Sequence, residues 1–255
     1  MGIVNVTPNS FSDGGRYFDA PRAIEHGLQL RAEGADLVDV GGESTRPGAE
    51  PVPVEEELAR VVPVVEALAR EGVAVSVDTL KPEVMRAAIA AGCVVLNDVN
   101  GFRAEGALEA VAREKVGVVV MHMQGTPRTM QQAPHYDDVV AEVGGFLAGR
   151  ARALEAAGIA AERIAIDPGF GFGKTLAHNQ QLFRGLPRLC ELGWPVLVGV
   201  SRKKMIGDLT GQPVESRTAG SVAAALLAVQ NGASIVRVHD VRPTVDAINV
   251  WMGLR

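Results

Sequence analysis

Short apolar runs rich in valine and isoleucine alternate along the chain with longer segments in which apolar residues recur every three to four positions. The short runs are typical of buried strands, and the longer spacing is typical of amphipathic helices. The pattern predicts strands at Ile3–Val6, Asp36–Gly41, Ala74–Asp78, Val94–Val99, Gly117–Met123, Arg163–Asp167, Pro195–Val200 and Ser234–His239. It predicts helices between them, including Val54–Arg70, Glu83–Ala91, Val139–Ala157, Ser221–Asn231 and Thr244–Met252.

Eight strands that alternate with helices predict an α/β protein, and the count of eight favours a (β/α)₈ TIM barrel. The 255 residues suit one such barrel, and no linker or low-complexity stretch divides them, so we expect a single domain over residues 1–255. A doubly wound open sheet is the alternative, because alternation alone does not distinguish an open sheet from a closed one.

Composition narrows the range of functions. Hydrophobic residues make up 47 % of the chain but aromatic residues only 4 %, which suits strands buried on both faces by aliphatic side chains. The net charge of −5 argues against a general nucleic-acid binder, which needs a basic face. Cys93 and Cys190 show no metal-ligand spacing, and no signal peptide or membrane-spanning run is evident. We therefore expect a cytoplasmic protein with no membrane partner.

Polar residues end every predicted strand, and the C-terminal strand ends of a barrel meet at one mouth, where such enzymes place their chemistry. These residues are Asn5, Asp39, Glu43, Asp78, Asn97, Asp98, His122, Asp167, Ser201, Arg202, Lys203, Arg237, His239 and Asp240. Some of them, such as Asp39, Asp98 and Asp240, have the simpler alternative of capping the next helix. His122 is better explained as a structural hydrogen-bonding residue than as a catalytic one. The set as a whole predicts a binding site.

The chemical types at this mouth indicate a class of ligand. Carboxylate and amide groups at Asp78, Asn97 and Asp167 suit the edge of an amino-oxo-pyrimidine ring. Lys203, together with Arg237 and His239, offers donors and positive charge for a ring carbonyl and a phosphate group. The pattern predicts an anionic heterocycle with a phosphorylated arm. The alternative is that these residues form ion pairs that only hold the barrel ends together.

Three loops after strands are rich in polar residues and glycine. Residues 5–15 mix Asn, Thr, Ser and Asp with one Phe and resemble an active-site lid. In the second loop, residues 41–48, Arg46 is a candidate for binding a carboxylate. The third loop, residues 167–175, ends in Gly-Lys-Thr, but the nucleotide-binding pattern needs four residues between its glycines, and Gly169 leaves only three. A nucleotide-binding loop is therefore rejected.

The ordered set of motifs at the strand ends resembles the dihydropteroate synthase family from Met1 to about Val241. The motifs are NVTPNSFSDGG, DVGGESTRPGA, SVDTLKPEV, LNDV, MHMQGTP, IDPGFGFGK, GVSRKKMIG and IVRVHDV. One loop alone would be a weak signal, whereas the ordered set is specific. The resemblance implies condensation of a (7,8-dihydropterin-6-yl)methyl diphosphate with p-aminobenzoate, Mg²⁺ as cofactor, and a homodimer.

Roles follow from the resemblance position by position. The residues that resemble the family's pterin-diphosphate contacts are Thr45, Asp78, Asn97, Met121, Asp167, Phe172, Gly199, Lys203, Arg237 and His239. Those expected at the p-aminobenzoate pocket are Phe11, Thr45, Arg46, Pro47 and Ser201. Those expected to support the chemistry are Asp78, Asp167, Lys203, Arg237 and His239. The resemblance assigns Asn5 as the Mg²⁺ ligand and Asp13 as the acidic residue that orders the first loop.

Two positions depart from the family pattern, and two other functions remain open at this stage. Asn9 stands where the family usually has Asp, which removes a negative charge near the metal. Leu80 replaces a small or aromatic residue, with no catalytic effect expected. A pterin-dependent methyltransferase would share the acidic residues but would have little use for the Thr-Arg-Pro and Ser-Arg-Lys segments. A catalytically silent pterin-binding barrel would be expected to lose the first or second loop.

Overall fold

Eight short parallel strands form the centre of the protein in a computed structural model that describes residues 1–7, 20–46 and 48–255. The strands are β1 (Gly2–Asn5), β2 (Val38–Gly41), β3 (Val75–Asp78), β4 (Val95–Asp98), β5 (Gly117–Met121), β6 (Ile164–Asp167), β7 (Leu197–Val198) and β8 (Ile235–Val236). β2 to β8 each lie within a strand that the sequence predicts, and β1 begins one residue before its predicted strand. The last two are shorter than predicted.

The strands close into a barrel. β1 to β6 pair in sequence order as one parallel sheet, and β7 pairs with β8. Single bridges join the two parts, because Ile166 pairs with Val196 and Gly2 pairs with Val238. The amide of Ile3 donates to the carbonyl of Val238 at 3.1 Å, so the first strand meets the end of the last. An open doubly wound sheet is excluded, and the predicted (β/α)₈ barrel is confirmed.

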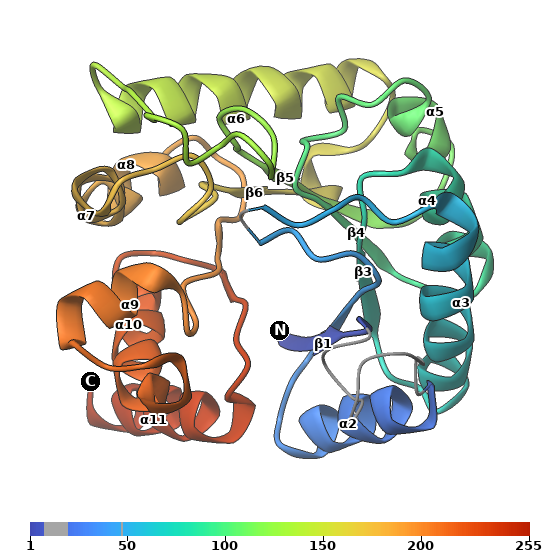
Figure 1. Ribbon diagram of the computed structural model, residues 1–255, viewed down its shortest axis with the longest axis horizontal. Helices are drawn as coiled ribbons and strands as arrows, with labels where there is room; N and C mark the ends of the chain where they lie inside the picture. The colour runs from blue at the N-terminus through green and yellow to red at the C-terminus, as the bar shows by residue number, and fades with distance from the viewer. Residues whose placement is uncertain (8–19, 47) are drawn as a thin grey trace.

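Helices surround the strands (Figure 1). They are α2 (Ala20–Ala32), α3 (Val54–Arg70), α4 (Pro82–Ala90), α5 (Ala107–Val111), α6 (Val139–Ala156), α7 (Leu176–Arg184), α8 (Leu186–Cys190), α9 (Lys204–Thr210), α10 (Thr218–Gln230) and α11 (Val241–Leu254), with 3₁₀ turns η1 (Ala161–Arg163) and η2 (Val214–Ser216). Within the described ranges, no helix has both the length and the apolar character needed to cross a membrane.

Helix α3 illustrates why these segments fold as they do. Its buried residues Val61, Val64, Val65 and Leu68 follow the spacing of one helical face, and all four are fully shielded from solvent. That face packs against the strands, whose valine and isoleucine side chains are buried as well. Burial on this scale supplies the main stabilising free energy. It also leaves the polar residues at the strand ends on a rigid frame.

Candidate active site

Strand register brings the predicted pterin contacts together in pairs. Asp78 at the end of β3 lies opposite Asn97 on β4, and Met121 on β5 lies opposite Asp167 on β6. Because the strands are parallel, these four side chains share the C-terminal mouth of the barrel. Asn5 ends β1 at the same level, opposite Gly41.

Arg237, which follows β8, is the centre of an ion-pair network across the barrel. Its Nε donates to Asp39 Oδ2 at 2.6 Å, and its Nη2 donates to Asp78 Oδ2 at 3.0 Å. Asn97 Nδ2 donates to the same oxygen of Asp39 at 3.4 Å. Burial opposes the charge of Arg237, but its attraction to the two carboxylates outweighs that effect and raises its pKa. A fixed guanidinium therefore lies beside the predicted pterin contacts.

Lys203 lies on the other side of this network, at the start of α9. Its ammonium donates to the carbonyl of Phe170 at 2.7 Å and lies 4.7 Å from the centre of the Phe172 ring. A Cβ atom added to Gly199 would lie 3.8 Å from both Lys203 Nζ and Arg237 Cβ, so the glycine keeps the space between the two cations open. Burial lowers the pKa of Lys203 to about 8, against the attraction of Asp167.

The carboxylates of this site titrate unusually. Burial raises the pKa of Asp78 to about 7, although Arg237 works in the opposite direction. Burial also raises the pKa of Asp167, opposed by Lys203 and by a hydrogen bond from the amide of Gly169. One oxygen of Asp78, Oδ1, accepts no hydrogen bond from the described residues. Perturbed buried carboxyl groups beside fixed cations are a feature of ligand-binding and catalytic sites.

The third loop is organised from within by Lys174. Its ammonium is only 3 % exposed and donates to the carbonyls of Gly169 and Phe172, each at 3.0 Å. It also lies 3.0 Å from Nδ1 of His122, whose pKa burial lowers to about 3. His122 is therefore a neutral acceptor in this contact. Because Lys174 faces its own loop, it cannot serve as the phosphate-binding lysine of a nucleotide-binding loop, in agreement with the sequence analysis.

His239 and Ser201 form a second polar group at the mouth. Ser201 Oγ accepts from the amide of His239 and lies 3.1 Å from its Nδ1. Burial, followed by the charges of Arg237 and Arg202, lowers the pKa of His239 to about 4. Arg46 contributes to that lowering as well, which brings the second loop within electrostatic reach of this histidine. At neutral pH His239 is therefore an uncharged hydrogen-bonding group.

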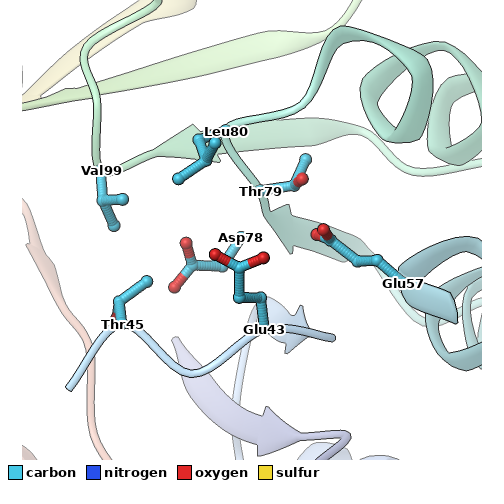
Figure 2. Close-up of a pocket in the computed structure, with 7 residues that line it drawn as sticks. All are labelled: Glu43, Thr45, Glu57, Asp78, Thr79, Leu80 and Val99. Atoms are coloured by element: carbon cyan, nitrogen blue, oxygen red, sulfur yellow. The ribbon is translucent and has the colours of Figure 1, made fainter. Parts of the chain in front are cut away.

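The second loop borders a small cavity beside Asp78 (Figure 2). The cavity has a volume of about 10 Å³, the size of about one water molecule. Its lining residues are Glu43, Thr45, Glu57, Asp78, Thr79, Leu80 and Val99. Thr45, which is expected to contact both substrates, therefore lies close to Asp78, one of the predicted pterin contacts.

Several predicted residues fall outside the described residues: Asn9, Phe11 and Asp13 in the first loop, and Pro47 in the second. The predicted metal ligand Asn5 is described and half-buried. Within the described residues there is no group of three His, Cys, Asp or Glu side chains arranged to hold a metal. An amide oxygen beside a phosphorylated substrate fits Mg²⁺, which commonly takes one or two protein ligands together with substrate phosphates.

Three aspartates were considered possible helix caps, and the structure separates them. Asp98 accepts from the amides of Asn100 and Phe102, each at 2.7 Å, so it stabilises a turn. Asp240 makes no side-chain cap to α11 and instead forms a two-point ion pair with Arg202. Asp39 is fully buried and holds Arg237. None of the three therefore caps the helix that follows it, because α3, α5 and α11 have no side-chain cap.

Three contributions were missed from the sequence: Asp39 as the partner of Arg237, Lys174 as the organiser of the third loop, and Lys81, which follows β3, as the partner of Glu43 in the second loop. Asp39 had a signal in the sequence, because it is a carboxylate between two valines in a strand buried on both faces. Lys174 had none, since the direction of a side chain in a glycine-rich loop is not a sequence property.

Comparison with known proteins identifies the family. Residues 1–239 match the family of pterin binding enzymes. A dihydropteroate synthase of Neisseria meningitidis serogroup C is 54 % identical over 259 residues, which cover 100 % of this chain and 92 % of that protein. This chain belongs to the dihydropteroate synthase family of pterin-binding enzymes.

Solved structures of the family agree. The dihydropteroate synthase of Xanthomonas albilineans with 4-aminobenzoic acid superposes with a TM-score of 0.93 at 61 % identity, covering 99 % of this chain and 91 % of that one. Its complex with 7,8-dihydropteroate gives a TM-score of 0.90 at 58 % identity, with coverages of 99 % and 92 %. The predicted family is confirmed.

Proposed function

We propose that this chain is a transferase that condenses (7,8-dihydropterin-6-yl)methyl diphosphate with p-aminobenzoate, giving 7,8-dihydropteroate and diphosphate in folate biosynthesis. The observation that carries the proposal is the cluster of Asp78, Asn97 and Lys203 around Arg237 at the mouth of a barrel of this family. The ligands 4-aminobenzoic acid and 7,8-dihydropteroate in two Xanthomonas albilineans complexes support both substrates.

The pterin ring binds through its polar edge. Asp78 and Asp167 accept from the ring N–H groups, Asn97 supplies a donor and an acceptor, and Lys203 donates to the ring carbonyl. Met121 and Phe172 line the slot, and the missing side chain of Gly199 leaves room for the flat ring. The family resemblance assigns Arg237 the stacking contact with the ring and the contact with the diphosphate.

The diphosphate departs next to Arg237 and His239. Negative charge grows on the leaving oxygen as its bond to the pterin methylene carbon breaks, so donors already in place there lower the barrier. Arg237 supplies a permanent charge and the neutral imidazole of His239 supplies a hydrogen bond. Asn5 would hold Mg²⁺, which would supply positive charge to the departing diphosphate.

The amine of p-aminobenzoate then forms a C–N bond to the methylene carbon and gives up one proton to solvent. The aryl amine is unprotonated at neutral pH, so its nitrogen lone pair can attack without a strong general base. Arg46 pairs with the carboxylate of this substrate, and Thr45, Pro47, Ser201 and Phe11 complete its pocket, while Asp13 orders the first loop. The carboxylates of Asp78 and Asp167 favour a cationic pterin intermediate, which makes a dissociative course reasonable.

The test of this function is diphosphate release by the purified chain. We expect release that requires both p-aminobenzoate and Mg²⁺, with 7,8-dihydropteroate as the product. Sulfonamides should compete with p-aminobenzoate. Lys203→Ala should lower kcat/KM by about tenfold or more, a loss of about 1.4 kcal/mol in transition-state stabilisation. Release that proceeds equally without p-aminobenzoate would rule the proposal out.

The same assay distinguishes the alternatives. A pterin-dependent methyltransferase would transfer a methyl group and release no diphosphate, whereas a silent barrel would bind pterin without turnover. A homodimer and a cytoplasmic location remain proposals that follow from the family.

A further inference from the structure

Lys81 follows β3 at the N-terminal end of α4, and its side chain turns inward. Only 14 % of that side chain is exposed. Its ammonium donates to Glu43 Oε2 at 2.5 Å and also to Glu57 Oε2. Burial opposes the charge, but the two hydrogen bonds outweigh it and raise the pKa of Lys81. We call these three side chains the Lys81 cluster.

The two carboxylates of the Lys81 cluster belong to different parts of the protein. Glu57 projects from α3 and its side chain is only 1 % exposed (Figure 2). Its second oxygen, Oε1, accepts no hydrogen bond from the described residues. The contact between Lys81 and Glu57 therefore neutralises a buried charge of the scaffold, and its loss would be destabilising.

Glu43 belongs to the second loop, and the segment that contains this loop continues to Pro53, just before α3. The oxygen that accepts from Lys81 also accepts from the amide of Val52 at 3.0 Å. Glu43 thus links the start of this segment to Val52 near its end. The ion pair with Lys81 attaches Glu43 to the barrel. The start is held independently as well, because Arg60 on α3 donates to the carbonyl of Gly42 at 2.7 Å.

The segment between these two fastened points contains Thr45 and Arg46. Thr45 lines the small cavity that Glu43, Glu57 and Asp78 also border (Figure 2). Lys81 lies only three residues after Asp78 in the chain. Lys81 therefore connects β3, which ends at the predicted pterin contact Asp78, to the loop that is expected to hold the second substrate.

We propose that Lys81 is a positioning residue for p-aminobenzoate. Lys81 acts through Glu43 and holds the second loop in the arrangement that binds this substrate. The proposal rests on the function given above. It assigns the two contacts of Lys81 separate tasks: the one with Glu57 stabilises the scaffold, and the one with Glu43 places Thr45 and Arg46. Loss of the lysine should then weaken binding of the second substrate far more than binding of the pterin.

The test compares Lys81→Met with the double variant Lys81→Met/Glu57→Gln in the full chain. We expect the KM for p-aminobenzoate to rise about tenfold in both, with the KM for the pterin diphosphate changing by less than about threefold. Removing the unpaired charge of Glu57 should restore most of the Tm lost in the single variant but not the KM. Amides of residues 43–52 should exchange with deuterium about tenfold faster in both variants.

Arg70→Met is the matched control, because this cation pairs with Glu66 on the exposed side of α3 with 74 % of its side chain in solvent. Arg70→Met should change neither the KM for either substrate nor the rate of deuterium exchange at residues 43–52. Recovery of the KM together with the Tm in the double variant would show that Lys81 only stabilises the scaffold. Equal rises in both KM values, or unchanged exchange at 43–52, would also overturn the proposal. A parent protein without turnover would instead refute the function, while exchange would still test the loop attachment.

Discussion

At the residue scale, one cation and one carboxyl group of the mouth have pKa values near neutral pH. Burial lowers the pKa of Lys203 to about 8 and raises that of Asp78 to about 7. In the proposed function both groups act in their charged forms, Lys203 as an ammonium donor and Asp78 as a carboxylate acceptor. The charged forms coexist best in a narrow interval between the two pKa values.

This predicts a bell-shaped pH dependence of kcat/KM for the pterin diphosphate, which reports groups of the free enzyme. Activity should rise as Asp78 loses its proton near pH 7 and fall as Lys203 loses its proton near pH 8. Initial rates from pH 5 to about 10 would measure both limbs. In Lys203→Arg the guanidinium stays charged, so the alkaline limb should disappear while the acid limb remains. A profile in which both limbs survive this substitution would contradict the assignment.

At the scale of elements, the third loop between β6 and α7 depends on its glycines. Gly169 has a φ of +67°, and a Cβ atom there would lie 1.9 Å from the carbonyl oxygen of His122. That oxygen belongs to the backbone of the neighbouring segment and cannot move without disturbing it. The close approach places the loop against His122 and Met121 beside the pterin slot.

Gly169→Ala should therefore destabilise the fold by more than about 3 kcal/mol, because it adds both a clash and backbone strain. Gly145→Ala is the control, since Gly145 lies exposed inside α6 with nothing within 4 Å of an added Cβ. That change should stabilise by about 0.5–1 kcal/mol. Urea unfolding followed by circular dichroism would measure both. Similar midpoints for the two variants would contradict the packing described here.

Elements were predictable from the sequence because their signals are local. Helix α3 begins and ends at the predicted residues, and every strand except β1, which starts one residue early, lies within a predicted run. β7 and β8 came out at two residues each, since pairing with a neighbour depends on the closure of the barrel. The ion pair of Asp240 could not be predicted for a similar reason: its partner Arg202 is 38 residues away in the chain.

At the scale of the whole molecule, helices α9, α10 and α11 carry large apolar side chains in solvent. Leu209 is 54 % exposed, Leu227 50 %, Val250 60 % and Met252 54 %. Apolar surface of this kind supports the proposed homodimer, because burying it in an interface is favourable.

Sedimentation velocity should therefore show the parent chain at twice its monomer mass at micromolar concentration. Leu227→Lys combined with Val250→Lys should shift it to monomer, since two buried charges oppose association. Val94→Lys is the matched control, because Val94 is 47 % exposed but lies before β4, away from these helices. A parent that sediments as a monomer, or an equal effect of the control, would exclude this surface.

The candidate site was predictable at this scale because the C-terminal ends of the parallel strands meet at one mouth. This topology alone predicts that Asp78, Asn97 and Lys203 lie close together. The network of Arg237 was not, since it joins residues 159 and 198 positions apart. Which carboxylate pairs with which cation depends on side-chain direction inside the closed barrel.

The junction between β1 and the end of β8 has a consequence for biosynthesis. The amino group of Met1 donates to the carbonyl of Val236, 235 residues later. During translation the first strand therefore keeps an unpaired edge until residues 236–238 have been synthesised, and such edges promote aggregation. Arg237 directly follows β8, so the nascent chain completes the polar residues of the barrel mouth at the stage at which the edge of β1 becomes paired.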